Sequence, residues 1–147
     1  MNDEPALPLP TPLLRFVALF NGGQCWESHE VLEGPWRAEG SEFYHGLILY
    51  ASAFVHLQRG NAHGIVAQLE KARKALAQYE PEYLGVDVTL LRQDAIRLMD
   101  EVRRHRSEPP SLWTDRIDQP KLQLDTRRIR GTEPELGEVG SEYGDRP

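Results

Sequence analysis

The stretch from Glu42 to Gln58, EFYHGLILYASAFVHLQ, constrains the fold of this chain most strongly. Ser41 is a suitable N-cap for a helix that starts here, and the Arg-Gly-Asn triplet at 59–61 ends it. Apolar side chains occupy nearly every side of this helix. A helix that is apolar all round must be covered by neighbours on most of its sides. The stretch therefore predicts a central helix in an all-α protein.

Other helices are predicted on both sides of this central one. The spacing of apolar residues predicts helices over residues 13–20, 62–78 and 88–106. A further helix is predicted from about residue 24 to residue 33 or beyond, with a bend or short stop at Gly34-Pro35, because an interior proline lacks the amide N–H. The predicted fold is a single all-α bundle of about five helices with an extended C-terminal tail.

The chain has 147 residues, which suits one domain with a sizeable core. We expect the helical bundle to occupy residues 12–108 and an extended or partly disordered tail to occupy residues 109–147. The proline-rich residues 1–11 should be extended, and residues 131–147 should be mobile. Four apolar side chains of the tail could clamp it to the body or to a second subunit, which leaves a homodimer open: Trp113, Ile117, Leu122 and Leu124.

Composition favours a soluble cytoplasmic protein. Cys25 is the only cysteine, which excludes an internal disulfide and is consistent with a reducing compartment. The first twelve residues, MNDEPALPLPTP, lack the features of a signal peptide, and no apolar run approaches the length of a membrane span. Residues 92–130 carry 10 basic and 7 acidic side chains, a mixture that does not favour nucleic-acid binding, and only the cluster of Arg103, Arg104 and Arg106 points toward it. The expected partner is an unknown protein or a small-molecule ligand.

The segment QCWESHEVLEGPW, residues 24–36, holds a candidate metal site. Its His-Glu-x-x-Glu pattern differs by one residue from the zincin motif His-Glu-x-x-His. If this helix packs antiparallel to the central one, Glu33 lies beside His45. His29, Glu33 and His45 would then supply the three protein ligands of a catalytic zinc site, since zinc accepts imidazole nitrogen and carboxylate oxygen.

The remaining members of this hypothesis are a base and a fourth candidate ligand. Glu30 would act as the general base for a metal-bound water. His56 shares a helix face with His45 and is the further candidate ligand. A structural alternative is that His29 pairs with a carboxylate or a tyrosine within the core, and that His56 is a satisfied core histidine.

Three segments together resemble a known family. They are LFNGGQCWESHEVLEGPWR at 19–37, FYHGLI at 43–48 and HLQRGN at 56–61, and they resemble the bacterial and archaeal domain of unknown function 309 over about residues 13–80. The resemblance implies a small helical bundle without an established activity. This sequence departs from the family pattern at Cys25 and at His45. The family's signature positions fall on Phe20, Asn21, Trp26, Glu27, His29, Glu30, Glu33, Trp36, Arg37, Gly46, His56, Arg59, Gly60 and Asn61.

Two functions remain open from the sequence. The first is a binding or scaffolding module, because the Gly60-Asn61 turn and the helix after it locally resemble tetratricopeptide units, which bind extended peptides. The second is a metal-dependent hydrolase that uses the His-Glu-x-x-Glu site. The residues expected to line the binding site are Trp26, Glu27, Trp36, Arg37, Tyr50, Arg59 and Asn61.

Overall fold

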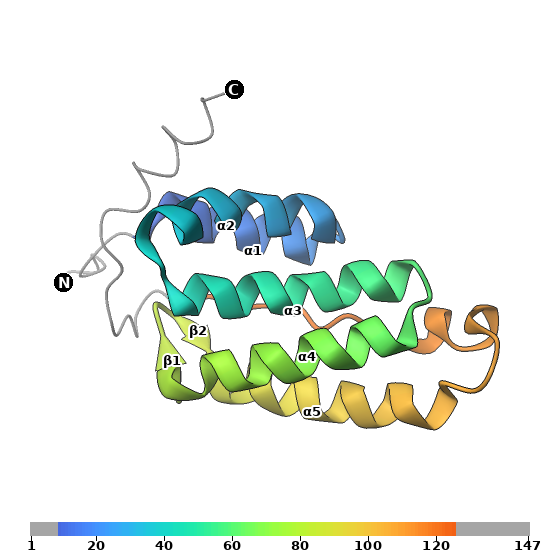
Figure 1. Cartoon of the computed structure of the whole chain (residues 1–147). Helices are drawn as coiled ribbons and strands as arrows, with labels where there is room; N and C mark the ends of the chain where they lie inside the picture. The colour runs from blue at the N-terminus through green and yellow to red at the C-terminus, as the bar shows by residue number, and fades with distance from the viewer. Residues whose placement is uncertain (1–8, 126–147) are drawn as a thin grey trace.

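The computed structural model describes residues 9–125. The predictions of an extended start and a mobile end fall largely on residues 1–8 and 126–147, which lie outside the described residues. The predicted all-α class is confirmed (Figure 1). The α-helices of the described chain are α1 (Thr11–Asn21), α2 (Cys25–Glu39), α3 (Glu42–Gln58), α4 (Ala62–Leu76) and α5 (Val88–His105).

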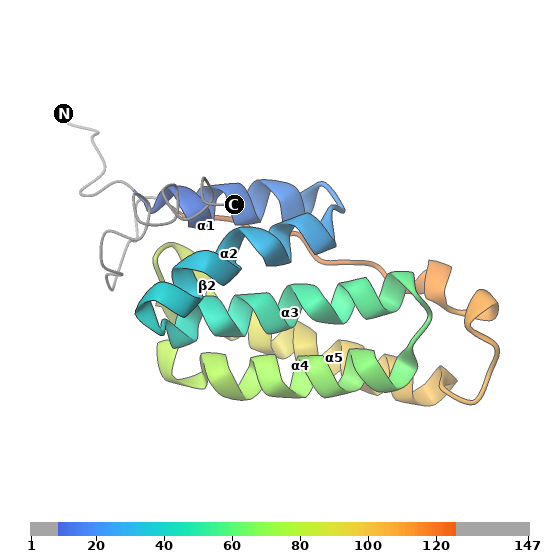
Figure 2. The same cartoon turned by 45° about the horizontal axis from the view of Figure 1, so that its top comes forward.

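The α3 helix lies in the middle of the bundle. Figures 1 and 2 show α1 and α2 on one side of it and α4 and α5 on the other. On the α1 side, the ring of Phe20 lies 5.5 Å from the rings of both Tyr50 and Phe54. On the α4 side, Gly46 lies directly against Leu76. The apolar surface all around α3 thus selects a three-layer arrangement in which each neighbour covers part of it.

Side-chain caps fix the starts of three helices. Ser41 Oγ accepts a hydrogen bond from the amide of Tyr44 at 3.1 Å, as the sequence predicts. At the start of α4, Asn61 Oδ1 accepts a hydrogen bond from the amide of Gly64. At the start of α5, Asp87 Oδ1 accepts one from the amide of Leu90. These bonds satisfy N–H groups that the first helical turn leaves without a partner. The helix starts are therefore set locally by the sequence.

Of the two outcomes expected at Gly34-Pro35, a bend or a short stop, the stop is wrong, because α2 continues through Pro35 to Glu39. Pro35 is buried, and Leu32 one turn earlier is fully buried. Burial of this face offsets the loss of one helical hydrogen bond at the proline, a cost of roughly 3 kcal/mol. The helix ends instead at Gly40, whose φ of 71° is the left-handed conformation that glycine adopts readily.

A short hairpin between α4 and α5 was not predicted. Strands β1 (Glu82–Tyr83) and β2 (Val86–Asp87) pair antiparallel around Leu84 and Gly85, which have φ values of 49° and 79°. Two consecutive residues with positive φ are typical of a tight hairpin turn. Leu84 is a rare residue for that conformation, and its side chain is buried in the core. Its burial offsets the backbone strain.

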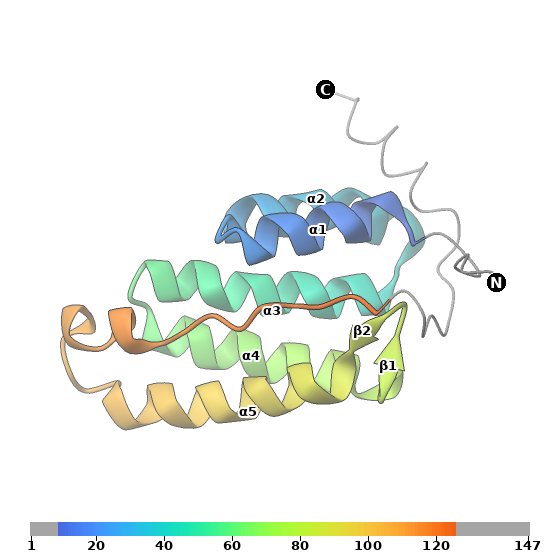
Figure 3. The same ribbon diagram turned by 180° about the vertical axis from the view of Figure 1, so that it is seen from behind.

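The C-terminal segment packs on the bundle and is not extended throughout. Two 3₁₀ turns, η2 (Pro110–Leu112) and η3 (Thr114–Arg116), come first, and the chain then runs extended across the back of the bundle (Figure 3). Trp113, Ile117 and Leu122 are buried in the same core as the helices. The division into a domain at 12–108 and a tail from 109 stays a prediction.

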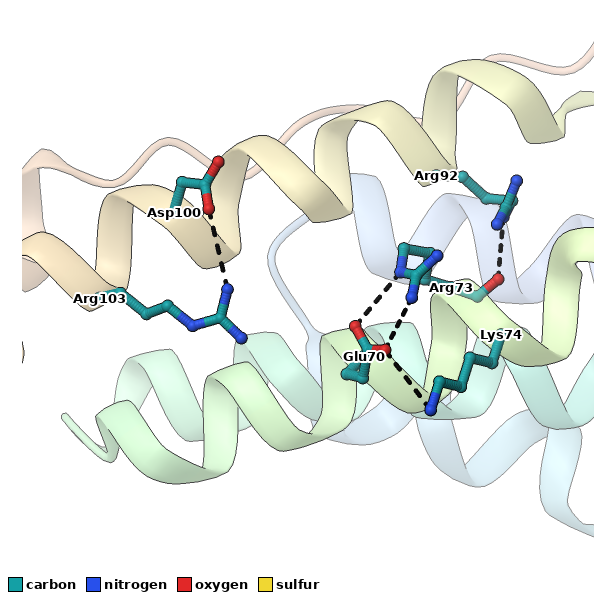
Figure 4. Close-up of polar contacts among 6 residues, drawn as sticks. All are labelled: Glu70, Arg73, Lys74, Arg92, Asp100 and Arg103. Carbon is teal, nitrogen blue, oxygen red and sulfur yellow. Dashed lines mark hydrogen bonds and ion pairs between the residues drawn. The ribbon is translucent and has the colours of Figure 1, made fainter.

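Polar contacts tie α5 to the end of α4 (Figure 4). Arg92 of α5 donates from Nε to the main-chain oxygen of Arg73 at 2.8 Å and also pairs with Glu80. Glu70 accepts two hydrogen bonds from Arg73, at 2.7 and 3.2 Å. An arginine at the C-terminal end of a helix satisfies carbonyls of its last turn and complements the helix dipole. The two contacts of Arg92 thus orient α5 on the end of α4.

In the part of the chain that the structure describes, no helix has both the length and the apolar character needed to cross a bilayer.

Replacing Gly46 with alanine should destabilise the bundle. The added Cβ would lie 2.6 Å from Cγ and Cδ2 of Leu76, which is fully buried. We expect the free energy of unfolding, measured in urea, to fall by about 1–3 kcal/mol. In a Leu76→Ala background the same substitution should cost less, because the clashing atoms are gone. A Gly46→Ala chain more stable than the native one, as helix propensity alone favours, would contradict this close approach.

Cys25 should react slowly with alkylating agents. Burial raises the pKa of its thiol from 9.0 to about 11, and the nearby Glu27 charge adds to this shift. Two pKa units correspond to about a hundredfold less thiolate at pH 8. The rate of iodoacetamide labelling should therefore rise with a midpoint near 11 in the folded chain and near 9.0 in guanidinium. Equal midpoints would contradict the prediction.

Candidate functional site

The α2 helix has a buried face and an adjoining face at the surface. Its buried face consists of Cys25, Ser28, Leu32 and Pro35, which recur at the spacing of one helix face. The next face, rotated toward solvent, carries most of the polar residues that the sequence analysis singled out. These residues are Trp26, His29, Glu30, Glu33 and Arg37.

His29, Glu30 and Glu33 come together on this second face. One ligand atom from each of the three lies within 4.8 Å of the others. Nε2 of His29 is 3.6 Å from Oε2 of Glu33, one turn further along. The side chains of His29 and Glu33 are 17% and 29% exposed, and Glu30 is exposed. The group therefore lies at the rim of the core and is open to water on one side.

The spacing of these atoms is compatible with a metal ion after a small adjustment. Ligands that bind zinc at about 2.0–2.2 Å in a tetrahedron lie roughly 3.3–3.6 Å apart. The present spacing of up to 4.8 Å would have to close by somewhat more than an ångström. Rotation of the exposed Glu30 side chain and the half-buried Glu33 side chain can supply this. The three donors, one imidazole and two carboxylates, are of the type that zinc and similar divalent cations accept.

Trp26 and Arg37 border this group along the helix. The ring of Trp26, 50% exposed, stacks on His29 at 5.3 Å between centroids. Nη2 of Arg37 lies 3.9 Å from the Glu33 carboxylate. Glu27 lies in the first turn of α2, where the helix dipole favours a negative charge. An aromatic ring and a cation thus flank the carboxylates at opposite ends of the exposed face.

The structural alternative for His29 predicts a hydrogen bond to a carboxylate or a tyrosine. The contact to Glu33, 3.6 Å, is longer than a hydrogen bond. The other ring nitrogen, Nδ1, is buried and has no hydrogen-bond partner among the described residues. The imidazole is held by its stacking on Trp26 and by its contact with Glu33.

His45 is not part of this group. Its ring stacks on Trp36 from α2, with centroids 4.4 Å apart and planes 5° from parallel, and its Nδ1 lies 3.6 Å from Glu42. The Trp36 contact shows that α2 and α3 run side by side near the register that the sequence predicts. Within residues 9–125, however, the group that could hold a metal ion consists of His29, Glu33 and Glu30, whereas the sequence predicted His45 as its third member. The spacing of glutamates at i, i+3 in α2 was the sequence signal for this.

His56 lies at the turn between α3 and α4, apart from the α2 group. Asn61 donates a hydrogen bond from Nδ2 to Nδ1 of His56 at 3.1 Å, while its Oδ1 accepts from the amide of Gly64. Burial, with the nearby Arg59 charge, lowers the pKa of His56. A Cβ at Gly64 would lie 2.6 Å from His56 Nδ1. The Asn61 and Gly64 contacts make this turn a tightly packed corner.

Tyr50, predicted to line a binding site, lies in the core. Its side chain is fully buried between Phe20 and Phe54, and its hydroxyl makes no hydrogen bond with any part of the chain that the structure describes. Burial raises the pKa of Tyr50, the Asp94 charge adds to this effect and Arg97 opposes it. Its burial separates Tyr50 from the exposed face of α2.

Comparison with known proteins relates part of this chain to a family. The family model described as Domain of unknown function (DUF309) matches residues 13–68, which include all of α2 and α3. No curated protein and no solved structure matches the chain. The match covers most of the residues on which the sequence resemblance rests and confirms it. Over residues 13–68, which is less than half of the chain, the sequence is similar to the domain of unknown function 309 family.

Proposed function

We propose that this protein is a binding module that holds a divalent cation, with zinc as the first candidate, on the exposed face of α2. The observation that carries the proposal is the convergence of His29, Glu30 and Glu33, whose ligand atoms lie within 4.8 Å of one another. Three protein donors leave at least one coordination position open. A water or a donor group of a protein or small-molecule ligand would complete the coordination sphere, so the metal would form part of a binding surface.

The arrangement favours binding over hydrolysis. The hydrolase alternative requires His29, Glu33 and a histidine of α3 as ligands, with Glu30 free to act as a base. The candidates for that histidine are His45 and His56, and His56 lies at the turn between α3 and α4. His45 instead contacts Trp36 and Glu42, and Glu30 joins the ligand group. One carboxylate would then have to serve as both ligand and base. A metal-binding module needs no such double role.

A cytoplasmic setting fits this proposal. Cys25 is the only cysteine, and its thiol is free and buried. A reducing compartment keeps such a thiol intact.

Purified, untagged protein should bind zinc at one ion per chain. Because His29 and Glu33 supply two of three ligands, His29→Ala and Glu33→Ala should each lower the affinity at least about tenfold, as measured by elemental analysis and isothermal titration. Zinc in excess should raise the melting temperature of the native chain, because a ligand that binds only the folded state stabilises it. Stacking on His29 makes Trp26 a fluorescence reporter of binding.

Two histidine variants serve as controls. His63 is exposed on α4 and His45 is outside the ligand group, so His63→Ala and His45→Ala should retain zinc. Zinc binding that is lost in His45→Ala and retained in a Glu30→Gln variant would restore the ligand set of the hydrolase alternative. Absence of zinc from the native chain, under conditions in which a known zinc protein loads fully, would refute the proposal.

A further inference from the structure

Residues 117–125, here called the strap, run extended across the back of the bundle from η3 to the hairpin (Figure 3). The strap lies outside residues 13–68, and the proposed metal site does not use it. It is held by hydrogen bonds in its middle and at its C-terminal end, and by two buried side chains, Ile117 and Leu122. These contacts are of the kind that a bound peptide makes with a receiving surface on a protein.

Asn21, at the end of α1, recognises the backbone of the strap. Its Nδ2 donates to the main-chain oxygen of Leu122 at 2.7 Å, and its Oδ1 accepts from the amide of the same residue at 2.8 Å. One side-chain amide thus satisfies both main-chain polar groups of one residue, as a neighbouring β-strand would. This contact needs an extended backbone and is independent of the side chain at that position.

Two side chains of the strap add sequence specificity. Gln119 donates from Nε2 to the main-chain oxygen of Phe20 at 2.7 Å, and its Oε1 accepts from the thiol of Cys25. Lys121 Nζ lies 3.2 Å from the main-chain oxygen of Asn21. The last carbonyls of a helix lack helical donors and carry partial negative charge, so an amide and an ammonium group suit them.

The far end of the strap extends the hairpin. Leu124 forms an antiparallel bridge with Val86, and the amide of Asp125 donates to the main-chain oxygen of Gly85 at 2.8 Å. Addition of a strand to an exposed sheet edge is a recurring mode of peptide recognition. The receiving surface is therefore defined by Phe20, Asn21, Cys25, Gly85 and Val86.

We propose that this surface is a binding site for an extended peptide of another protein, which the chain fills with its own strap. The peptide that fits carries the pattern Gln-x-Lys-Leu of residues 119–122, with its backbone paired to Asn21 and to Val86. None of these contacts requires that the strap be joined to α5. The connecting residues 106–112 are all exposed, and Trp113 anchors them separately. Peptide binding at this surface requires that the strap, with Ile117 and Leu122, can leave the core while the five helices stay packed.

Tethering makes the strap a strong competitor. A segment joined by a short linker acts at an effective concentration of roughly millimolar. A peptide of the same sequence should therefore bind the native chain weakly and bind a chain with a weakened strap well. While the strap occupies the receiving surface, only partners with higher affinity would bind there. Weaker partners would bind only when the strap is released.

The test uses the full-length chain and a labelled peptide of residues 115–125, DRIDQPKLQLD, in fluorescence anisotropy. The double variant Gln119→Ala/Leu122→Ala weakens the strap and leaves the receiving surface intact. It should bind the peptide at least tenfold more tightly than the native chain. Adding Asn21→Ala to this variant, or making the same two alanine changes in the peptide, should remove that gain. A folded double variant that binds the peptide no better than the native chain would overturn the proposal.

Hydrogen exchange of the native chain tests release without any substitution. The amides of Leu122 and Asp125 are bonded to the receiving surface, whereas the amide of Ala51 lies within α3. If the strap leaves while the helices stay packed, the two strap amides should exchange at least tenfold faster than that of Ala51. Equal rates would mean that the strap leaves only when the whole bundle unfolds, and would overturn the proposal even if the double variant failed to fold.

Discussion

Burial of α3 on most of its sides is the constraint on which the rest of the structure depends. Its apolar side chains cannot be covered by one neighbour, so α1 and α2 cover one side and α4 and α5 the other (Figure 1). Gly46 allows α4 to approach closely, and Tyr50 and Phe54 meet the aromatic rings of α1. Because removal of apolar surface from water is the main favourable term in folding, these contacts position each helix, including the one that carries the candidate site.

The candidate metal site is a consequence of how α2 packs on this central helix. The helical period that buries Cys25, Leu32 and Pro35 leaves His29, Glu30 and Glu33 at the rim of the core. Full burial of two carboxylates and an imidazole would cost several kcal/mol per charge, whereas a position at the rim keeps them hydrated. The continuation of α2 through Pro35 belongs to the same arrangement, because it lets Trp36 stack on His45 and so extends the contact with α3.

The strap closes the bundle between segments that are far apart in the sequence. It places donors on the last carbonyls of α1 and adds a bridge at the hairpin. These are polar contacts of an extended backbone, so they differ in kind from the apolar packing between helices. The molecule thus carries two separate surfaces with distinct chemistry: carboxylates and an imidazole on α2, and main-chain acceptors with a side-chain amide at the end of α1.

The sequence alone determined the helical class, the starts of α3 and α4, and the His29 and Glu33 pair, because helical periodicity, capping and i, i+4 spacing are local properties. It missed the hairpin, whose Leu84 holds a positive φ only because its side chain is buried in the core. It also assigned a ligand role to His45 and a binding role to Tyr50. Only the tertiary structure decided where these two side chains lie, because helix packing determines which rings come into contact. His45 stacks on Trp36, and Tyr50 stacks on Phe20.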